Sequence, residues 1–219
     1  PHALRLYVNL SVLRNNLAAL KKCTAAKICA VVKADAYGHG LRAIEAFSDA
    51  DAFAVSSIGE ALEVREHTDK PIDILSSPDR TAPHVYPEGV FPSVSSADDV
   101  AFVAAFGATQ INVKVNSGMN RYGADTNDLP ELFRSAERAG LKIRSAFSHI
   151  YDISAAEEQF ARFMRDIAPY ASAVPQKHIL SSNFAVLPAY MHLDMVRPGI
   201  VLYGYGHGLI ESAITATCG

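Results

Sequence analysis

The chain has 219 residues, of which 49% are hydrophobic and 20% are charged, and its formal net charge is -3. A chain of this length buries one large core, so we expect one principal domain. The slight negative charge provides no basic field, which argues against nucleic acid as a partner. No apolar stretch approaches the roughly 20 residues that span a bilayer, which argues against a membrane partner and for a soluble protein.

The three cysteines form neither a paired framework nor a close-spaced metal motif. This usage is typical of a cytoplasmic protein, and we expect no metal site. The first helix is predicted around residues 10–20, because Leu10, Leu13, Leu17 and Leu20 recur at helical spacing after Asn9, a good N-cap residue.

Short apolar runs then alternate with helical segments along the whole chain. The run 28–32 is rich in β-branched residues and stops at Lys33, as a buried parallel strand would. Similar runs follow at 52–55, 72–75, 90–94, 111–115, 143–147, 178–180 and 195–202. Ser57 with Glu60, and Ser154 with Glu157, have the spacing of capping boxes at helix starts.

Eight alternating units favour an α/β fold of the (β/α)8 TIM-type barrel class over an open doubly wound sheet. We place the barrel domain at residues 1–203. Residues 204–219 begin with a glycine cluster that is typical of a hinge or linker, or of a simple turn.

Polar residues gather where the predicted strands end, which is where active sites of such barrels lie. They are Lys33, Lys114, Arg121, His149, Ser182, Asn183 and Arg197. A lysine at the end of a buried strand loses its proton more easily, which suits it to condensation with a carbonyl and to proton transfer. Position alone also allows a strand-end lysine that extends to solvent.

The segment AVVKADAYGHG, residues 30–40, closely resembles the cofactor-lysine motif of alanine racemases, a family of fold-type III pyridoxal-phosphate enzymes. The resemblance extends over nearly the whole chain. It continues through AFAV at 52–55 with Glu60 and Ala61, VKVNSGMNRYG at 113–123, Ser148 with His149, and MVRPGIVLYG at 195–204.

The resemblance implies pyridoxal 5'-phosphate as the cofactor and a role for each matching residue. Lys33 would hold the cofactor as a Schiff base and act as the catalytic base. The implied contacts are Tyr37, Gly199 and Ile200 with the phosphate, Arg121 with the phenolic oxygen, His149 beside the ring, and Arg197 with the pyridine nitrogen. Lys114 matches a lysine that is carbamylated in many members. His39 belongs to the motif but receives only a structural role.

Arginine donates hydrogen bonds and keeps its proton, so a pyridine nitrogen beside Arg197 would have to accept. An unprotonated ring withdraws electrons less strongly and favours return of a proton to the substrate α-carbon. Without the motif, Arg197 would also fit a surface ion pair, and Tyr37 and His149 would fit core packing.

Two positions depart from the family pattern. After the seventh run the family usually carries Asn-Ser, whereas this chain reads SSNF at residues 181–184, so either Ser182 or Asn183 could contact the phosphate. Asn116 replaces an aspartate that is common in the family, which removes a negative charge near Lys114 and Arg121.

Racemisation needs acid–base groups on both faces of the α-carbon. The family supplies the second group as a tyrosine from a C-terminal β domain of the partner subunit, and this chain stops near the point where that domain would begin. We therefore expect the barrel domain of an alanine racemase, a homodimer when intact. The alternative is a single-domain pyridoxal-phosphate carrier, while a metal-assisted aldolase would need a metal-binding pattern that the sequence lacks.

Overall fold

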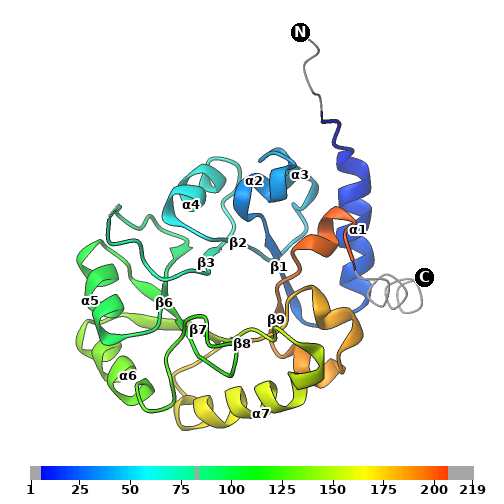
Figure 1. Ribbon diagram of the computed structural model, residues 1–219. Helices are drawn as coiled ribbons and strands as arrows, with labels where there is room; N and C mark the ends of the chain where they lie inside the picture. The colour runs from blue at the N-terminus through cyan, green and yellow to red at the C-terminus, as the bar shows by residue number, and fades with distance from the viewer. Residues whose placement is uncertain (1–5, 82–83, 207–219) are drawn as a thin grey trace.

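The strands of the chain form a ring that helices surround (Figure 1). The computed structural model describes residues 6–81 and 84–206. All strand pairs are parallel, in one sheet of order β4-β3-β2-β1-β9 and another of order β5-β6-β7-β8. The strands are β1 (Lys27–Val31), β2 (Ala52–Val55), β3 (Ile72–Ile74), β4 (Val90–Phe91), β5 (Ser93–Val94), β6 (Gln110–Lys114), β7 (Lys142–Phe147), β8 (Lys177–His178) and β9 (Met195–Val196).

Two joints close the ring between these sheets. At one, Pro92 separates β4 from β5, and the two short strands share one position because β4 pairs with β3 and β5 pairs with β6. At the other, the backbone amide of Asp194 donates to Lys177 (3.1 Å) and that of Arg197 donates to Leu180 (3.0 Å). Eight parallel strand positions therefore form a barrel, which confirms the predicted fold class.

Helices connect most of the strands around the outside of the ring (Figure 1). Asn9 caps the first helix as predicted, since its side chain accepts from the backbone amides of Ser11 and Val12. The α-helices are α1 (Leu10–Lys22), α3 (Ala43–Ala46), α4 (Ile58–Arg65), α5 (Ala97–Ala105), α6 (Leu129–Arg138) and α7 (Ala156–Ile167), while the short element α2 (Lys33–Gly38) is a turn whose residues 34–37 have left-handed backbone angles. The short 3-10 helices are η1 (Ile153–Ala155), η2 (Ala168–Tyr170), η3 (Ser182–Val186), η4 (Ala189–His192) and η5 (Ile200–Tyr203).

Two local predictions were wrong. The run 195–202 is not one strand, because β9 ends at Val196 and η5 follows; Pro198 has no amide hydrogen with which to continue the ladder. Ser154 does not cap α7, because it lies inside η1 and donates its amide and hydroxyl to Asp152. The other predicted box is half formed: Ser57 caps α4, while the Glu60 side chain bonds outside the helix.

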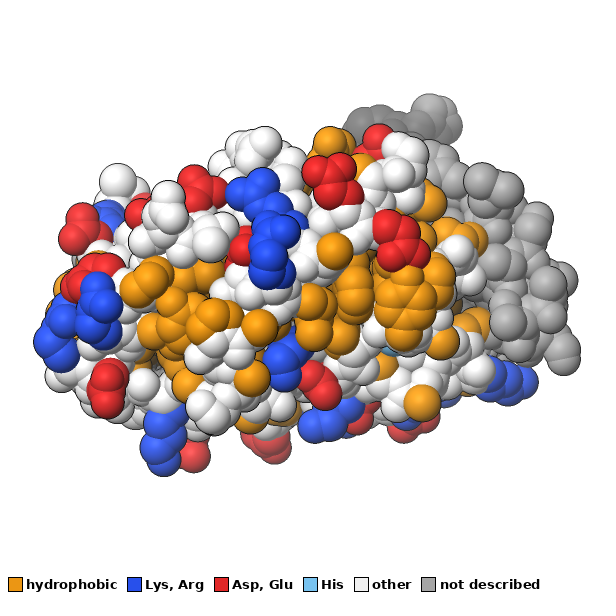
Figure 2. All heavy atoms as spheres, turned by 90° about the horizontal axis from the view of Figure 1, so that it is seen from below, with side chains coloured by type: hydrophobic (Ala, Val, Ile, Leu, Met, Phe, Trp, Pro, Cys, Tyr) orange, Lys and Arg blue, Asp and Glu red, His pale blue; other side chains and the backbone are white. Residues whose placement is uncertain are grey.

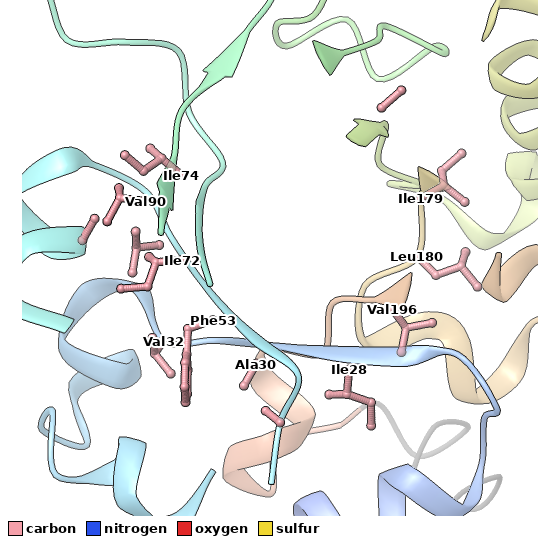
Figure 3. Close-up of a cluster of buried hydrophobic side chains, with 14 of the residues drawn as sticks. Ile28, Ala30, Val32, Phe53, Ile72, Ile74, Val90, Ile179, Leu180 and Val196 are labelled. Carbon is pink, nitrogen blue, oxygen red and sulfur yellow. The ribbon is translucent and has the colours of Figure 1, made fainter. Parts of the chain in front are cut away.

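The core lies mainly between the strands and the helices. Ile28, Ala30 and Val32 point away from the centre of the ring, as Figure 3 shows, and pack in the cluster that contains Leu17 of α1. Residues at the alternate positions of β1 face inward, where Cys29 and Val31 pack with Ala52, Ala54 and Met195. Polar side chains occupy much of the remaining interior: Asp73, Asn112, Lys114, Ser145, His178 and Arg197 are all buried.

No helix within residues 6–81 and 84–206 is long and apolar enough to cross a bilayer. On the side seen in Figure 2, acidic and basic side chains are interspersed among apolar patches. Of the segment predicted as a hinge, 204–219, residues 207–219 lie outside the described residues, so the boundary at 203 stays a prediction.

Candidate active site

A pocket of about 680 Å³ opens where the strands end at their carboxyl side. Its wall comes from residues that follow β1, β2, β3, β6, β7, β8 and β9. It brings together nine of the ten residues singled out from the sequence: Lys33, Tyr37, Lys114, Arg121, His149, Ser182, Arg197, Gly199 and Ile200. The tenth, Asn183, does not line it, since its amide group bonds to the backbone of Ile150 (3.2 Å) and Ser181 (3.0 Å).

Lys33 lies at the start of an unusual turn. The four residues Ala34, Asp35, Ala36 and Tyr37 all have left-handed backbone angles, with φ between 52° and 54°. For residues other than glycine this conformation costs about 1–2 kcal/mol each, and such strain often marks functional sites. The turn directs both Lys33 and Tyr37 into the pocket, and the Lys33 ammonium lies 5.9 Å from the centre of the Tyr37 ring.

Hydroxyl and amide groups converge on one side of the pocket. A Cβ atom added to Gly199 would stand 2.5 Å from the Tyr37 hydroxyl, so only glycine lets the tyrosine approach the backbone there. The Ser182 hydroxyl accepts from the amides of Gly199 (3.1 Å) and Val201 (3.5 Å) and so has its own proton to donate. Burial raises the pKa of Tyr37, which keeps its hydroxyl protonated at neutral pH. Such a group of donors suits an anion.

Arg197 is held deep in the barrel by a chain of polar side chains. One guanidinium nitrogen donates to the carbonyl of Ser148 (2.6 Å), and another donates to Nδ1 of His178. Because arginine only donates, His178 must carry its proton on Nε2, from which it donates to Ser145 (2.9 Å). Burial lowers the pKa of Arg197 to about 10, so the guanidinium keeps its charge at neutral pH.

Beyond Ser145 the chain of hydrogen bonds crosses the barrel interior. Ser145 donates to Asn112 (2.7 Å), whose amide nitrogen donates to Asp73 (3.0 Å), and Asp73 also accepts from Arg144 (3.1 Å). Burial and the neighbouring Arg197 lower the pKa of His178 well below its usual value. The residue is therefore neutral. His178 was not predicted as a site residue; the signal that could have indicated it is a histidine at an inward-facing position of a strand.

Lys114 is buried at the floor of the pocket, with 3% of its surface exposed. Its ammonium lies 4.9 Å from the ring centre of Phe147 and 5.7 Å from that of Tyr122. None of the ion pairs formed among the described side chains includes it. Burial, and then the charges of Arg197 and Arg121, hold its pKa well below the usual lysine value.

Tyr122 was not predicted as a site residue, and it lines the pocket beside Arg121. Its hydroxyl donates to the carbonyl of Leu75 at the end of β3, and the Arg121 guanidinium lies 5.2 Å from its ring centre. The tyrosine thereby ties the loop after β6 to β3 and supports the arginine by a cation–π contact.

The field in the pocket is strongly positive. Burial lowers the pKa of His149 to about 3, and the charges of Arg197, Lys114, Arg121 and Lys33 contribute to that shift. His149 is therefore neutral at pH 7, and the basic side chains of Lys33, Arg121 and Arg197 line the pocket that it borders. A dianionic ligand is the natural counterpart of such a field.

The side chain of Asn116 uses both its amide nitrogen and its amide oxygen in local hydrogen bonds. Its nitrogen donates to Asp125 (2.8 Å) and to Asn120 (2.9 Å), while its oxygen accepts from the amides of Gly118 and Asn120. An aspartate here would meet the carboxylate of Asp125. The departure from the family pattern is thus matched to Asp125 and shapes the loop that carries Arg121.

Residues 8–207 match the family model for "Alanine racemase, N-terminal domain". The chain belongs to this family. It is 31% identical over 222 residues to alanine racemase 1 of Caldanaerobacter subterraneus subsp. tengcongensis and 33% identical over 217 residues to an alanine racemase of Nitratidesulfovibrio vulgaris. These matches cover 91% and 90% of this chain but only 57% and 58% of the relatives, so the chain spans less than two thirds of their length.

Solved structures of alanine racemases share the barrel. One from Corynebacterium glutamicum superposes with a TM-score of 0.79 at 25% identity, covering 90% of this chain and 62% of its own. Another, from Bartonella henselae with covalently bound pyridoxal phosphate, has a TM-score of 0.76 at 25% identity over the same shares. The match to the alanine racemase family thus rests on both sequence and fold.

Proposed function

We propose that this chain is the pyridoxal-phosphate-binding barrel domain of an amino-acid racemase that acts on alanine, and that Lys33 holds the cofactor. The observation that carries the proposal is the meeting of Lys33 with the hydroxyl groups of Tyr37 and Ser182 in one positively charged pocket, beside the backbone of Gly199. Membership of the alanine racemase family and the covalently bound pyridoxal phosphate of the Bartonella henselae relative support it.

The residues present fit this cofactor. The pocket volume, about 680 Å³, lies in the usual range of about 300–1,000 Å³ for small-molecule sites. The phosphate would lie against Tyr37, Ser182 and the backbone of Gly199 and Ile200, where a Cβ at position 199 would intrude. Arg197 would donate to the ring nitrogen, Arg121 to the phenolic oxygen, and neutral His149 would border the ring.

When bound, pyridoxal phosphate supplies an electron sink that stabilises negative charge at the substrate α-carbon. Arg197 would limit that sink, because its charged guanidinium can only donate a hydrogen bond and would favour a ring nitrogen without a proton of its own. The amine of Lys33 would be the group that takes or returns a proton on one face of the substrate α-carbon.

The opposite face needs a second acid–base group, which we assign to sequence outside this chain. The relatives extend well beyond the part that this chain matches. We propose that a tyrosine from a C-terminal domain of a partner subunit supplies the group in a homodimer, and that residues 204–219 lead into that domain. The barrel alone is then expected to bind the cofactor but to racemise alanine poorly. A cytoplasmic location fits a protein of this kind.

We also propose that Lys114 is carbamylated. A lysine reacts with carbon dioxide as the neutral amine, and burial beside two arginines lowers its pKa toward that form. The carbon–nitrogen bond forms with release of a proton and turns Lys114 into an anion beside Arg121 and Arg197, where none of the ion pairs formed among the described side chains supplies a carboxylate. Mass spectrometry of intact protein in bicarbonate tests this.

The competing candidate, a single-domain pyridoxal-phosphate carrier, makes a different prediction for the same protein. Both functions require a cofactor absorbance band that Lys33→Ala abolishes. Only a racemase barrel recovers rapid conversion of L-alanine to D-alanine when it is joined to a C-terminal domain of a relative. A fusion that binds cofactor and still fails to racemise alanine would favour the carrier, while a missing band in the wild type would overturn the site.

A further inference from the structure

The strained turn that follows Lys33 needs a partner to hold its conformation. Ala34 to Tyr37 are four consecutive residues in the left-handed region, none of them glycine. Without external support such a segment relaxes to ordinary backbone angles, which would redirect the side chains at its two ends. These ends are Lys33 and Tyr37, the two residues that the turn delivers to the pocket.

Glu60 supplies that support at the lysine end. One oxygen of its carboxylate accepts from the backbone amide of Ala34 (2.8 Å), the residue directly after Lys33. The other oxygen accepts from the amide of Ser56 (2.6 Å), which follows β2 and lines the pocket. A single ionised side chain on α4 therefore joins the exits of β1 and β2 through two charge-assisted hydrogen bonds.

The tyrosine end of the turn is held differently. Nδ1 of His39 lies 3.0 Å from the carbonyl of Ala36, and the His39 ring stacks on Tyr203 with centres 4.6 Å apart. Tyr203 in turn donates its hydroxyl to Val31 of β1 (3.1 Å). This end thus rests on packed rings, whereas the side-chain support of the lysine end is the Glu60 carboxylate.

We propose that Glu60 is a positioning residue for Lys33: its bond to the Ala34 amide keeps the left-handed turn in place and so aims the lysine amine at the cofactor. The inference rests on the proposed function, because it concerns the residue that holds pyridoxal phosphate. Glu60 itself does not line the pocket and takes no part in the chemistry.

The chain contains a matched control in Asp99. Ser96 caps α5 and accepts from the Asp99 amide (3.1 Å), as Ser57 caps α4 and accepts from the Glu60 amide (3.2 Å). The Asp99 carboxylate accepts from the amide of Ser95 (2.9 Å), the residue before the cap, as Glu60 does from Ser56. It makes no contact with the turn after Lys33.

This comparison shows which substitution separates the two bonds of Glu60. An aspartate reaches the residue before the cap, as Asp99 does, so Glu60→Asp should keep the bond to Ser56. One methylene fewer should break the bond to Ala34. Glu60→Asp is therefore expected to retain the helix cap and to lose the support of the turn, while Asp99→Asn weakens a cap whose residues, Ser95, Ser96 and Asp99, do not line the pocket.

The experiment compares wild type, Glu60→Asp and Asp99→Asn as whole chains. Three quantities are measured: the thermal midpoint without cofactor, the dissociation constant for pyridoxal 5'-phosphate from its absorbance, and the rate at which borohydride fixes the cofactor to Lys33. Hydrogen exchange of the Ala34 amide, measured without cofactor, reports the turn directly. For Glu60→Asp we expect a dissociation constant raised about tenfold, or about 1.4 kcal/mol. We also expect slower trapping, faster exchange at Ala34 and a midpoint near that of wild type.

Asp99→Asn should show the reverse, a lower midpoint with affinity and trapping within about twofold of wild type. Normal trapping in wild type together with unchanged affinity and exchange in Glu60→Asp would overturn the positioning role. Equal losses of affinity in both variants would also overturn it, because they would point to general destabilisation. A wild type that never traps the cofactor on Lys33 would instead overturn the proposed function, and the exchange at Ala34 would still report on Glu60.

Discussion

The hydroxyl of Tyr37 lies against the backbone of Gly199, so close that a Cβ at position 199 would stand 2.5 Å from the hydroxyl oxygen and 3.2 Å from the ring carbon that bears it. These residues are 162 positions apart in the chain. They meet because β1 and β9 are paired neighbours in the barrel, so the segments that follow them share one side of the pocket.

Gly199→Ala is expected to weaken cofactor binding about tenfold, since the methyl group displaces the Tyr37 hydroxyl from the phosphate side of the pocket. Gly59→Ala in α4 is the control, because the new Cβ would meet only the hydroxyl of the cap residue Ser57, at 3.9 Å. It should leave affinity unchanged and stabilise the fold by about 0.5–1 kcal/mol. Absorbance titration and thermal unfolding measure both. Equal affinity of Gly199→Ala and wild type would show that Tyr37 does not contact the ligand.

Ser182 and Asn183 are neighbours with different predicted effects. Ser182→Ala removes a hydroxyl that lies in the pocket and orders the amides of Gly199 and Val201, so the dissociation constant for pyridoxal phosphate should rise about tenfold or more. Asn183→Ala removes bonds to Ile150 and to the backbone of Ser181 from a side chain that does not itself line the pocket, and it should lower stability while affinity stays within about twofold. The opposite ranking of the two affinities would assign the phosphate contact to Asn183.

The lowered pKa of Lys114 should make the stability of the protein depend on pH. Its pKa in the fold is well below that of an unfolded lysine, so between the two values the unfolded chain binds more protons. The free energy of unfolding should therefore rise with pH across that interval. Lys114→Met should flatten this rise and, in carbon-dioxide-free buffer at pH 7, stabilise the protein without cofactor by about 1 kcal/mol or more. Urea unfolding from pH 6 to 9 measures it, with Lys142→Met, at an exposed site, as the control. An unaltered pH dependence in Lys114→Met would contradict the assignment.

A double-mutant cycle can test the hydrogen bond between Asn116 and Asp125. Asn116→Asp replaces the bond of 2.8 Å to Asp125 by two facing carboxylates, which should lower stability by about 1 kcal/mol at pH 7. Asp125→Asn in the same chain should restore most of that loss. Additive losses in the double variant, measured by urea unfolding, would show that the two side chains do not interact.

The sequence was sufficient for the barrel because hydrophobic runs of strand length recur between helical segments, and inward polar residues cluster at the strand ends. It could not locate the break at Pro92, where a residue without an amide hydrogen divides one strand position into β4 and β5. The predicted last strand also ran past Pro198, because the residues of β9 and those of η5 are both apolar.

The site was predicted to the extent that its residues belong to local motifs. Lys33, Tyr37 and Gly199 were found in this way, and the pocket brings them together. His178 and Glu60 escaped notice as site residues, because their importance comes from partners far away in the chain: Arg197 for the first and Ala34 for the second. The left-handed turn was not predicted either, since only Asp35 of its four residues belongs to a type that is enriched at positive φ, and alanine and tyrosine are not.

The identity of the lysine that holds the cofactor is the sharpest test of the proposed function. Two lysines, Lys33 and Lys114, line the pocket. Protein saturated with pyridoxal 5'-phosphate is reduced with borohydride and mapped by peptide mass spectrometry. We predict a label on the peptide that contains Lys33, retained in Lys114→Met and absent from Lys33→Ala. A label on Lys114, or no label at all in saturated protein, would contradict the proposed function.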